Sequence, residues 1–303
     1  TPPPTPAWPF GAAKRPGNFL TNCISMKIET DTGIVELSIH RLENGQRRQT
    51  TDLVTREALL ALTINGFPAF HLLYLPGQEG ELSLGFLLTS GIIDTTADIQ
   101  ELRLLPVDIP AGRHFFQVQV RLAKTFQTKA DLTATVAAAV LRAEASAAAP
   151  LAATQFQATP SQEVQIEAST VLNLMASLPD RQDIFQQTGG THAIYLADVA
   201  SGEVILGAED VGRHNAFDKV IGQAMQKNLP TWNTIALLSG RASFEMVLKA
   251  ARAGIPLMAS VSAPTSLAIR LAHLQGITLM GFARRQRCNI YTHPQRCLAA
   301  GHP

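Results

Sequence analysis

The second half of the chain alternates short apolar strands with amphipathic helices, and this pattern restricts the possible fold more than any other feature. Strands are predicted at 192–197 and 203–206, joined by a turn. Apolar side chains then recur from Phe217 to Met225 at positions i, i+3, i+4, i+7 and i+8, which indicates a helix with one buried face. Strands alternating with such helices imply right-handed crossovers and a mostly parallel sheet with helices on its faces.

The same alternation continues toward the C-terminus. The two helices expected there carry apolar stripes and end at Gly254 and Gly276, as helices often do. Apolar strands are predicted at 235–238, 257–261 and 277–282. The sequence therefore predicts an α/β unit with a mixed sheet and flanking helices.

The first half predicts a smaller, strand-rich unit. Asn65-Gly66 stands between two apolar runs and is the strongest short-range signal for a β-hairpin, with strands at 59–64 and 67–73. Other elements expected from apolar alternation and helix-end signals are strands at 34–39 and 116–122 and a helix at 79–89. The predicted organisation is a Pro-rich tail at 1–27, an α+β domain at 28–145, an Ala-rich flexible loop at 146–160 and the α/β domain at 161–303.

Composition excludes several classes of protein. Apolar residues make up 46% of the 303 residues and charged residues 16%, which is enough apolar surface for real cores and excludes a mostly disordered chain. The formal net charge is +1, so no overall field favours nucleic acid or a membrane. No apolar run reaches the roughly 18 residues of a membrane-spanning helix, and no signal peptide is recognisable. Three cysteines without paired spacing are typical of a reducing cytoplasm.

Polar segments follow the predicted strands of the second half, and the topology brings them together. Four of them, 209–215, 239–243, 262–266 and 283–287, come directly after strands. In a parallel sheet they gather at the carboxyl edge, where α/β sheets bind ligands. The segment 189–192 precedes an antiparallel strand, so it begins at this same edge. The sequence therefore predicts a single site there.

The residue types in these segments favour an anionic ligand. Their arginine guanidinium groups suit phosphate, and the helix starts add free backbone N–H groups. Asp210 and Asp218 are acceptors for orienting arginines or binding a base edge. The donors are Arg213, Arg241, Arg284, Arg285 and Arg287, with hydroxyls from Ser239, Ser243, Ser262 and Thr265. A phosphorylated, nucleotide-like ligand fits this set.

A plainer interpretation exists for each residue alone. Asp210 with Arg213, or Asp218 with Lys219, can be helix-terminal charges on a solvated face. His192 and His214 can each be a structural histidine, and the run 284–287 can be a solvated patch. The expected clustering at one sheet edge favours a functional site over these alternatives.

Short motifs stand in both halves of the chain. Those in the second half are Thr188–Ala193, Glu209–Ala216 with Asp218-Lys219, Ser239-Gly240-Arg241 with Ser243, Glu245-Met246 and Lys249, Ser262–Ala268, and Gly281-Phe282 with Arg284 and Asn289–Tyr291. Those in the first half are Asn65-Gly66, Glu81-Leu82, Leu84–Leu87 and Gly91–Ile93. Together these motifs resemble the FdhD/NarQ family, over roughly residues 28 to 293 apart from the Ala-rich bridge.

The resemblance implies a fold, a cargo and partners. Members are similar in fold to cytidine deaminases and associate as dimers. They receive sulfur from a cysteine desulfurase on a Cys-x-x-Cys loop and deliver it to the bis-molybdopterin guanine dinucleotide form of the molybdenum cofactor, before that cofactor enters formate dehydrogenase. A guanine nucleotide would mimic this cargo.

The resemblance also assigns the candidate site. The segment 282–287 matches the family's cofactor-binding segment, and the other motifs are expected to line the same pocket. The candidate cofactor-binding residues are His192, Asp210, Arg213, His214, Asn215, Asp218, Lys219, Ser239, Gly240, Arg241, Ser243, Ser262, Ala263, Thr265, Phe282, Ala283, Arg284, Arg285, Gln286 and Arg287.

The chain departs from the family where the cysteine pair is expected. The stretch 147–154 contains no cysteine, and a persulfide needs a thiolate nucleophile, so the usual sulfur relay cannot run through this loop. Cys288 follows a run of arginines whose positive charge is expected to lower its pKa. It is therefore a candidate substitute carrier. The alternative is that Cys288 is a small, partly buried residue at the start of a strand.

Two other functions stay open at this point. Zinc deaminases need His-x-Glu and Pro-Cys-x-x-Cys, but Ile194 stands two residues after His192 and the stretch 239–243 has no cysteine, so no zinc is expected. A binding protein that keeps the cofactor pocket as a chaperone or regulator, without sulfur transfer, fits the missing cysteines better. Whether the chain is an enzyme depends on that choice. Formate dehydrogenase and a second copy are the expected partners, and a cysteine desulfurase only if sulfur transfer is retained.

Overall fold

The computed structural model describes residues 33–109, 113–126, 129–148 and 164–299. The predicted Pro-rich tail at 1–27 and most of the predicted loop at 146–160 lie outside these residues. Where that loop was expected to begin, helix α2 (Lys129–Ala148) continues through residue 148, so the Ala-rich composition extends a helix there.

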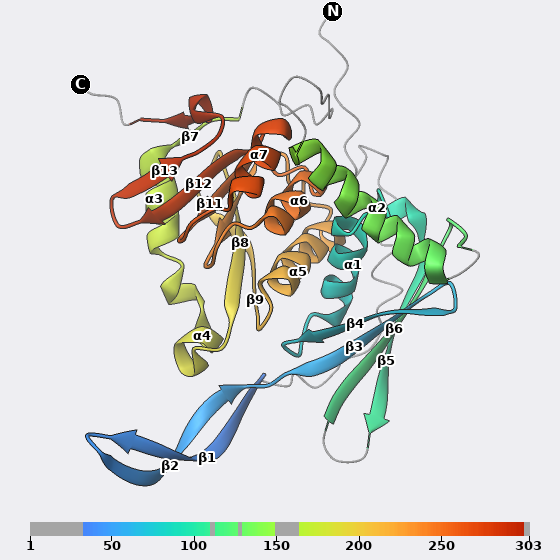
Figure 1. Ribbon diagram of the computed structural model, residues 1–303, viewed down its shortest axis with the longest axis vertical. Coiled ribbons are helices and arrows are strands. Elements are labelled where there is room, and N and C mark those ends of the chain that lie inside the picture. The colour runs from blue at the N-terminus through green and yellow to red at the C-terminus, as the bar shows by residue number, and fades with distance from the viewer. Residues whose placement is uncertain (1–32, 110–112, 127–128, 149–163, 300–303) are drawn as a thin grey trace, which may run out of the picture.

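The second half forms a six-stranded mixed sheet in the order β13-β12-β11-β10-β8-β9 (Figure 1). Strands β10, β11 and β12 are parallel, while β8, β9 and β13 each run antiparallel to their neighbours. The strands are β8 (His192–Asp198), β9 (Val204–Asp210), β10 (Thr234–Leu238), β11 (Leu257–Ser260), β12 (Thr278–Arg284) and β13 (Arg287–Ile290). An antiparallel pair beside a parallel run makes the mixed sheet that was predicted, and the α/β class is confirmed. The likeness to cytidine deaminases stays a prediction.

Both faces of this sheet are covered, which explains why its central strands are apolar throughout. Along β10, Ala236 and Leu238 join the apolar cluster formed with α5, α6 and α7, whereas Ile235 and Leu237 join the cluster formed with α3. The helices are α3 (Ala168–Ala176), α5 (Arg213–Gln226), α6 (Phe244–Arg252) and α7 (Ser266–Leu274), with α4 (Asp183–Thr188) beside β9 and a small β7–β14 pair (Ile166–Glu167 and Cys297–Leu298) behind α3. Short 3₁₀ turns are η1 (Thr96–Asp98), η2 (Pro179–Arg181) and η3 (Pro294–Arg296).

A four-stranded sheet in the order β4-β3-β6-β5 forms most of the first half. Its strands are β3 (Ala58–Ile64), β4 (Phe67–Tyr74), β5 (Ile99–Ile109) and β6 (Arg113–Leu122). The predicted hairpin is confirmed, because Asn65 and Gly66 both have the positive φ that a tight two-residue turn requires, at 49° and 85°. Helix α1 (Glu79–Thr89) has the predicted bounds.

The two halves of the chain share one hydrophobic core instead of each having its own. Side chains of α1, such as Leu82, join the same apolar cluster as Phe217 and Val220 of α5. Two glycines allow these helices to approach closely, because a Cβ at Gly85 would lie 1.8 Å from the backbone oxygen of Asp218, and one at Gly222 would lie 1.8 Å from that of Glu81. The first half is therefore fixed directly against the element that begins at the predicted site.

Strands β1 (Ile34–Glu43) and β2 (Gln46–Thr55) form a separate hairpin that projects from the body (Figure 1). The strand predicted at 34–39 is the first part of β1. In the part of the chain that the structure covers, no helix is long and apolar enough to cross a membrane.

Candidate functional site

The ends of β9 and β10 and the start of β8 meet at one edge of the sheet, as predicted. His192 lies opposite Asp210 in the β8–β9 register. Ser239 Oγ accepts a hydrogen bond of 2.8 Å from the Ala193 N–H, and the Ser239 N–H donates to the Ala193 carbonyl oxygen at 3.1 Å. Gly240 lies against the imidazole, since a Cβ there would be 3.4 Å from His192 Nδ1. Segments far apart in the sequence are thus in direct contact.

The loops after β10, β11 and β12 continue this edge as one connected row. The Ser260 hydroxyl donates to the Gly240 carbonyl oxygen at 2.6 Å. The Thr265 N–H donates to the Ala242 carbonyl oxygen, and the Phe282 N–H to that of Ser262, both at 3.1 Å. The stretches 239–243, 262–266 and 282–284 are therefore held side by side by hydrogen bonds between their backbones.

The starts of α5 and α6 carry polar groups that are left available. Neither N-cap residue, Gly212 or Ser243, caps its helix through its side chain, whereas Thr265 caps α7 by accepting from the Ala268 N–H. Arg213 Nε and Ser243 Oγ are buried atoms without a hydrogen-bond partner among the described residues. Uncapped helix starts and unpaired buried donors are what an anionic ligand would satisfy.

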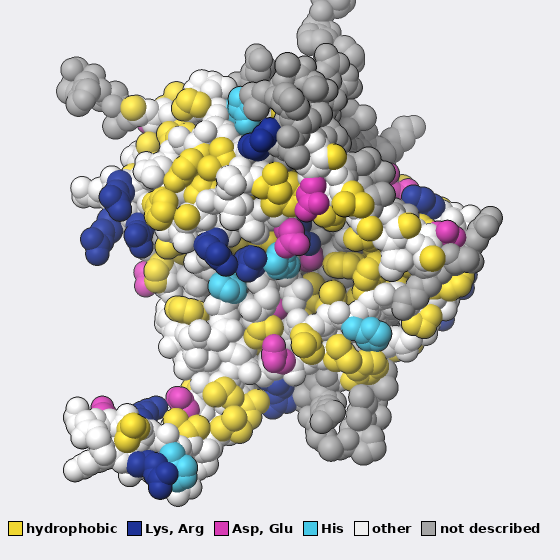
Figure 2. Space-filling model, viewed as in Figure 1, with side chains coloured by type: hydrophobic (Ala, Val, Ile, Leu, Met, Phe, Trp, Pro, Cys, Tyr) yellow, Lys and Arg dark blue, Asp and Glu magenta, His cyan; other side chains and the backbone are white. Residues whose placement is uncertain are grey.

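Two histidines stand among these groups and are held neutral. Burial lowers the pKa of His192, and the positive charge of Arg213 lowers it further. Burial also lowers the pKa of His214, against the opposing charge of Glu245, whose carboxylate contacts His214 Nε2. Figure 2 shows basic and histidine side chains together near the centre of the visible face, over the strand ends. A bound anion would favour the protonated form of these imidazoles.

Four of the candidate residues are instead buried, and their side chains form hydrogen bonds with the first half of the chain: Asp210, Asn215, Asp218 and Lys219. Asp210 accepts hydrogen bonds of 3.0 Å from the N–H groups of Leu75 and Gly212 and from Asn215 Nδ2, and it pairs with Lys219 Nζ at 2.8 Å. Asn215 also donates to the Leu73 carbonyl oxygen at 2.7 Å, and Lys219 to that of Leu75 at 2.7 Å. These contacts fasten the start of α5 to the link between β4 and α1.

Asp218 extends this buried network to α6. Its carboxylate receives hydrogen bonds from Thr89 Oγ1 at 2.6 Å and from Lys249 Nζ at 2.7 and 2.8 Å. Burial raises the pKa of Asp218, while the positive charge of Lys249 opposes that shift. The polar atoms of Asp210, Asp218 and Lys219 thus have protein partners. In this geometry they position the edge, and a direct contact with a ligand stays a prediction.

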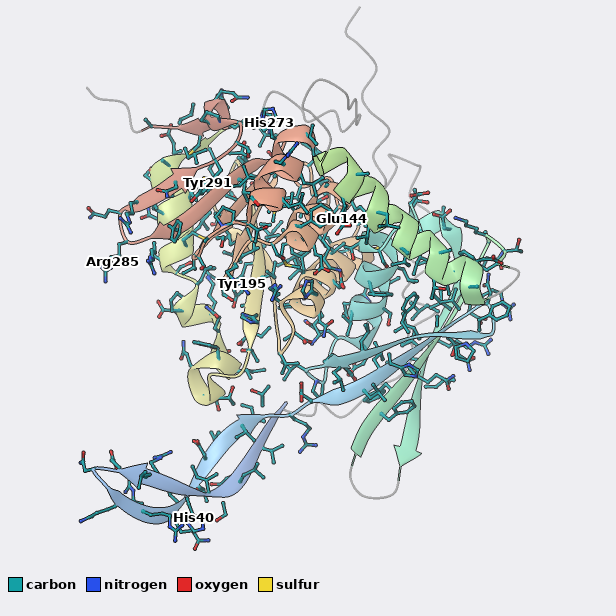
Figure 3. All side chains as sticks on the ribbon, in the orientation of Figure 1. His40, Glu144, Tyr195, His273, Arg285 and Tyr291 are labelled. Atoms are coloured by element: carbon teal, nitrogen blue, oxygen red, sulfur yellow. The ribbon has the colours of Figure 1, made fainter. Side chains whose placement is uncertain are left out.

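The predicted arginine segment forms the exposed turn between β12 and β13. Arg284 lies opposite Arg287 in the β12–β13 register, and Arg285 at the tip of the turn has a φ of 57°. Arg284, Arg285, Gln286 and Arg287 are all exposed, and Figure 3 shows Arg285 pointing into solvent. Three strands separate β9 from β12, so at about 4.8 Å per strand these two strands lie roughly 19 Å apart. The hairpin arginines and Arg213 therefore share an edge, but they can bind only different parts of an extended ligand.

The remaining candidates occupy the middle of the row. Arg241 is exposed in the loop after β10. In the loop after β11, Ser262 and Ala263 are half-buried and Thr265 is exposed. Phe282 is half-buried with a φ of 51°, and Ala283 is fully buried against the α3 side of the sheet. The available donors of this central part thus lie between the helix starts and the arginine hairpin.

Comparison with known proteins was made on this geometry. A model of the FdhD/NarQ family matches residues 55–298. The chain belongs to the FdhD/NarQ family. A relative named sulfur carrier protein FdhD, from Xanthomonas axonopodis pv. citri (strain 306), is 37% identical over 277 residues, covering 89% of this chain and 96% of the relative. The protein of the same name from Bordetella parapertussis is 39% identical over 250 residues, covering 82% of this chain and 88% of that one.

A solved structure of similar fold supports the same assignment. The crystal structure of a putative formate dehydrogenase accessory protein from Desulfotalea psychrophila matches with a TM-score of 0.67 and 26% sequence identity. The match covers 88% of this chain and 99% of that chain. The FdhD/NarQ resemblance seen in the sequence motifs is therefore confirmed.

Cys288 does not have the surroundings expected of a reactive thiol in this FdhD/NarQ protein. It is half-buried on β13 and packs against the apolar cluster on the α3 side, and this burial raises its pKa. The prediction that neighbouring arginines lower the pKa was wrong, because their side chains extend into solvent while the thiol faces the core. Cys297 is buried with a raised pKa as well, and Cys23 lies outside the described residues.

The sequence did not reveal a cavity of about 540 Å³ at the outer edge of β9. Its walls come from the link between β4 and α1, the start of α4 and one side of β9. Burial strongly raises the pKa of Tyr195 in its wall, and the Tyr195 hydroxyl donates to the Arg181 carbonyl oxygen. Only Lys219 of the candidate residues lines this cavity. Among the residues that the structure describes, no three His, Cys, Asp or Glu side chains gather as a metal site.

Proposed function

We propose that this FdhD/NarQ protein is a cytoplasmic formate dehydrogenase accessory protein that binds the bis-molybdopterin guanine dinucleotide cofactor as cargo. The observation that carries the proposal is the pair of uncapped helix starts, α5 and α6, with the unpaired buried donors Arg213 Nε and Ser243 Oγ beside them. Phosphate oxygens are suitable partners for such groups. The names of the sulfur carrier relatives and of the similar crystal structure support the same pathway.

The length of the row fits a cargo with two separated anionic parts. This cofactor carries two guanosine arms, each joined through a diphosphate. The helix starts and the arginine hairpin are basic regions near strands about 19 Å apart. We assign one diphosphate to the starts of α5 and α6 and the other to the hairpin of Arg284, Arg285 and Arg287. The middle of the row, with Arg241 and Thr265, would then contact the molecule between them.

The proposed role is cofactor binding and delivery to formate dehydrogenase rather than a sulfur relay. The stretch 147–154 lacks the family's cysteines, and burial makes Cys288 a poor nucleophile. The alternative is assistance in sulfuration, with a cysteine desulfurase contributing the reactive thiol at the edge of the site. The functional unit in both versions is a homodimer.

Guanosine diphosphate binding, measured by isothermal titration calorimetry, tests the site. We expect binding to the wild-type chain, and a loss of at least tenfold in affinity for Arg213→Ala combined with Ser243→Ala. Arg284→Ala combined with Arg285→Ala is expected to weaken binding if the nucleotide uses the hairpin end. Arg48→Ala, an exposed arginine on the β1–β2 hairpin, is the matched control and should leave the affinity unchanged. Absence of binding to the wild-type chain would refute the site. Binding of both double variants with the wild-type affinity would refute it as well.

Complementation separates delivery from sulfur transfer. The chain is expressed in a bacterial strain that lacks its own FdhD, and formate dehydrogenase activity is measured. If this chain only delivers a cofactor that is already sulfurated, it should not rescue the strain, because no other FdhD protein there sulfurates the cofactor. Rescue by this chain alone would favour the sulfuration alternative.

A further inference from the structure

A carboxylate, that of Glu245, lies among the groups proposed to bind phosphate. Glu245 is in the first turn of α6, two residues after the uncapped Ser243, and its side chain is 58% exposed. Figure 2 shows acidic side chains among the basic and histidine side chains near the centre of the visible face. A phosphate that approaches the start of α6 meets this negative charge. A site for phosphate alone therefore gives no reason for a carboxylate at this position.

Helix capping does not explain Glu245 either. In a capping box the carboxylate is on the third residue of the helix and accepts a hydrogen bond from the backbone N–H of the N-cap residue. Glu245 is the second residue of α6, and Met246 is the third. Among the described residues, the carboxylate of Glu245 accepts no hydrogen bond from a backbone N–H. What remains is a favourable interaction with the helix dipole, of about 0.3–1 kcal/mol at an exposed position.

The carboxylate of Glu245 is held in place by His214, the second residue of α5. The two side chains touch through His214 Nε2, so the carboxylate stands between the starts of α5 and α6. Burial lowers the pKa of His214, so the imidazole is neutral and does not cancel the negative charge of Glu245. A neutral imidazole has a single N–H, and the nearby carboxylate favours the tautomer with the proton on Nε2. One contact of this kind leaves most acceptor positions of the carboxylate open.

Positive charges nearby make this position compatible with an anionic ligand. The charges of Arg213 and Lys249 both act on His214, so both cations are close to the contact between His214 and Glu245. They offset the repulsion between the carboxylate and a bound phosphate. The starts of the two helices thus offer donors for phosphate and, beside them, one acceptor for a different part of the ligand.

The chemistry of a carboxylate restricts what that part is. Its two oxygens match a ligand edge with two parallel N–H donors, as they match a guanidinium group. Guanine has such an edge, formed by N1–H and the 2-amino group, and the pterin ring has the same 2-amino-4-oxo edge. Adenine has an unprotonated ring nitrogen at the corresponding position, which would face the carboxylate with a lone pair. Glu245 therefore suits guanine or pterin and disfavours adenine.

We propose that Glu245 selects the ligand by accepting two hydrogen bonds from the 2-amino-4-oxo edge shared by guanine and pterin, with His214 orienting its carboxylate. This rests on the proposed function, because the ligand must already be held by its phosphates at the starts of α5 and α6. Arg213 and the helix starts then contribute affinity, and Glu245 contributes discrimination. A residue in this position discriminates strongly because the wrong ring leaves the carboxylate without a donor.

Isothermal titration calorimetry with a panel of ligands tests the proposal. Guanosine diphosphate has both donors, inosine diphosphate lacks the 2-amino group, and adenosine diphosphate lacks the complete edge. We expect the affinity to fall in that order, with guanosine diphosphate favoured over adenosine diphosphate by about tenfold or more. In Glu245→Gln this preference should fall to within about threefold, because the amide has only one acceptor oxygen and its NH₂ group faces a donor.

Pyrophosphate separates selection from a structural effect. A weaker start of α6 would lower the affinity for all three nucleotides and for pyrophosphate by the same factor, and the preference between bases would not change. Loss of selection instead leaves the affinity for pyrophosphate equal to that of the wild-type chain or higher, because a negative charge has been removed. Glu43→Gln on β1 is the matched control, since its carboxylate is 61% exposed and far from α6 in sequence, and it should keep the wild-type preference.

Neopterin, which has the pterin ring without a phosphate, distinguishes the two sources of the edge. Loss of the preference for guanosine diphosphate in Glu245→Gln assigns the residue to guanine, whereas loss of neopterin binding with an unchanged nucleotide preference assigns it to pterin. A variant that changes neither would overturn the proposal. A wild-type chain that binds the two purine diphosphates equally and does not bind neopterin would overturn it as well, while leaving the phosphate site intact. Absence of binding to every nucleotide and to pyrophosphate would instead refute the proposed function.

Discussion

Two regions of the candidate site use the same kinds of residue for different purposes. Around the start of α5, Asp210, Asp218 and Lys219 are buried, and their charged groups bond to other parts of the chain. At the β12–β13 turn, Arg284, Arg285 and Arg287 are exposed. The first region holds the edge in place, and the second is exposed and free to contact a ligand. The family motifs therefore combine buried structural residues with exposed residues that we propose bind the ligand, and only their burial distinguishes the two kinds.

Loss of a buried carboxylate should give the largest effect. Asp210→Ala would leave Lys219 buried without its counter-ion and would free the N–H groups of Leu75 and Gly212. We expect the free energy of unfolding to fall by about 3–5 kcal/mol, as measured by urea denaturation. Arg285→Ala at the exposed turn is the control and should change it by less than about 0.5 kcal/mol. Similar effects of the two substitutions would contradict the distinction drawn here.

The second largest effect on the free energy of unfolding is expected from a substitution where α1 and α5 approach closely. In Gly222→Ala the added methyl group would meet the Glu81 backbone oxygen, so we expect a loss of about 1–3 kcal/mol in the free energy of unfolding. Helix propensity by itself predicts a gain of up to about 1 kcal/mol for this change. The sign of the measured difference therefore decides whether the helix contact dominates.

Ligand binding between the two regions should depend on pH. The pKa of His192 is lowered in the free protein, so its imidazole is neutral at pH 7. A bound diphosphate would raise that pKa, so binding takes up a proton and strengthens as pH falls from 7.5 toward 5.5. Calorimetry in buffers of different ionisation enthalpy should detect a several-fold gain. His192→Gln should weaken this dependence and leave the part due to His214, and an unchanged pH profile in that variant would exclude His192 as a source.

The smallest effect on stability is expected from substitution of Cys288, which follows the arginine turn on β13. Cys288→Ala removes one half-buried sulfur atom and should lower the free energy of unfolding by about 1 kcal/mol or less. Persulfide labelling after incubation with a cysteine desulfurase, followed by mass spectrometry, should be the same as in the wild-type chain. Labelling that disappears in the variant would restore Cys288 as a sulfur carrier.

Local patterns in the sequence predicted much of the fold correctly. The Asn65-Gly66 turn, the bounds of α1 and the alternation of strands and helices after residue 192 all depend on neighbouring residues, so short windows contain the information. The shared edge of the sheet followed from the same alternation, because the direction of each strand fixes where its loops lie. Extension of α2 through residue 148 was missed, since a run of alanines has no apolar stripe to reveal it.

The sequence by itself determined which segments meet at the carboxyl edge and which residue types they bring there. Only the tertiary structure decided that Asp210 and Asp218 are buried and bonded to the first half of the chain, and that the thiol of Cys288 faces the core. It also decided that a cavity lies beside β9. The physical reason is that strand and helix periods are local, whereas burial depends on elements far apart in the chain. The packing of α1 on α5 fixes the partners of those carboxylates, and no short stretch of sequence records it.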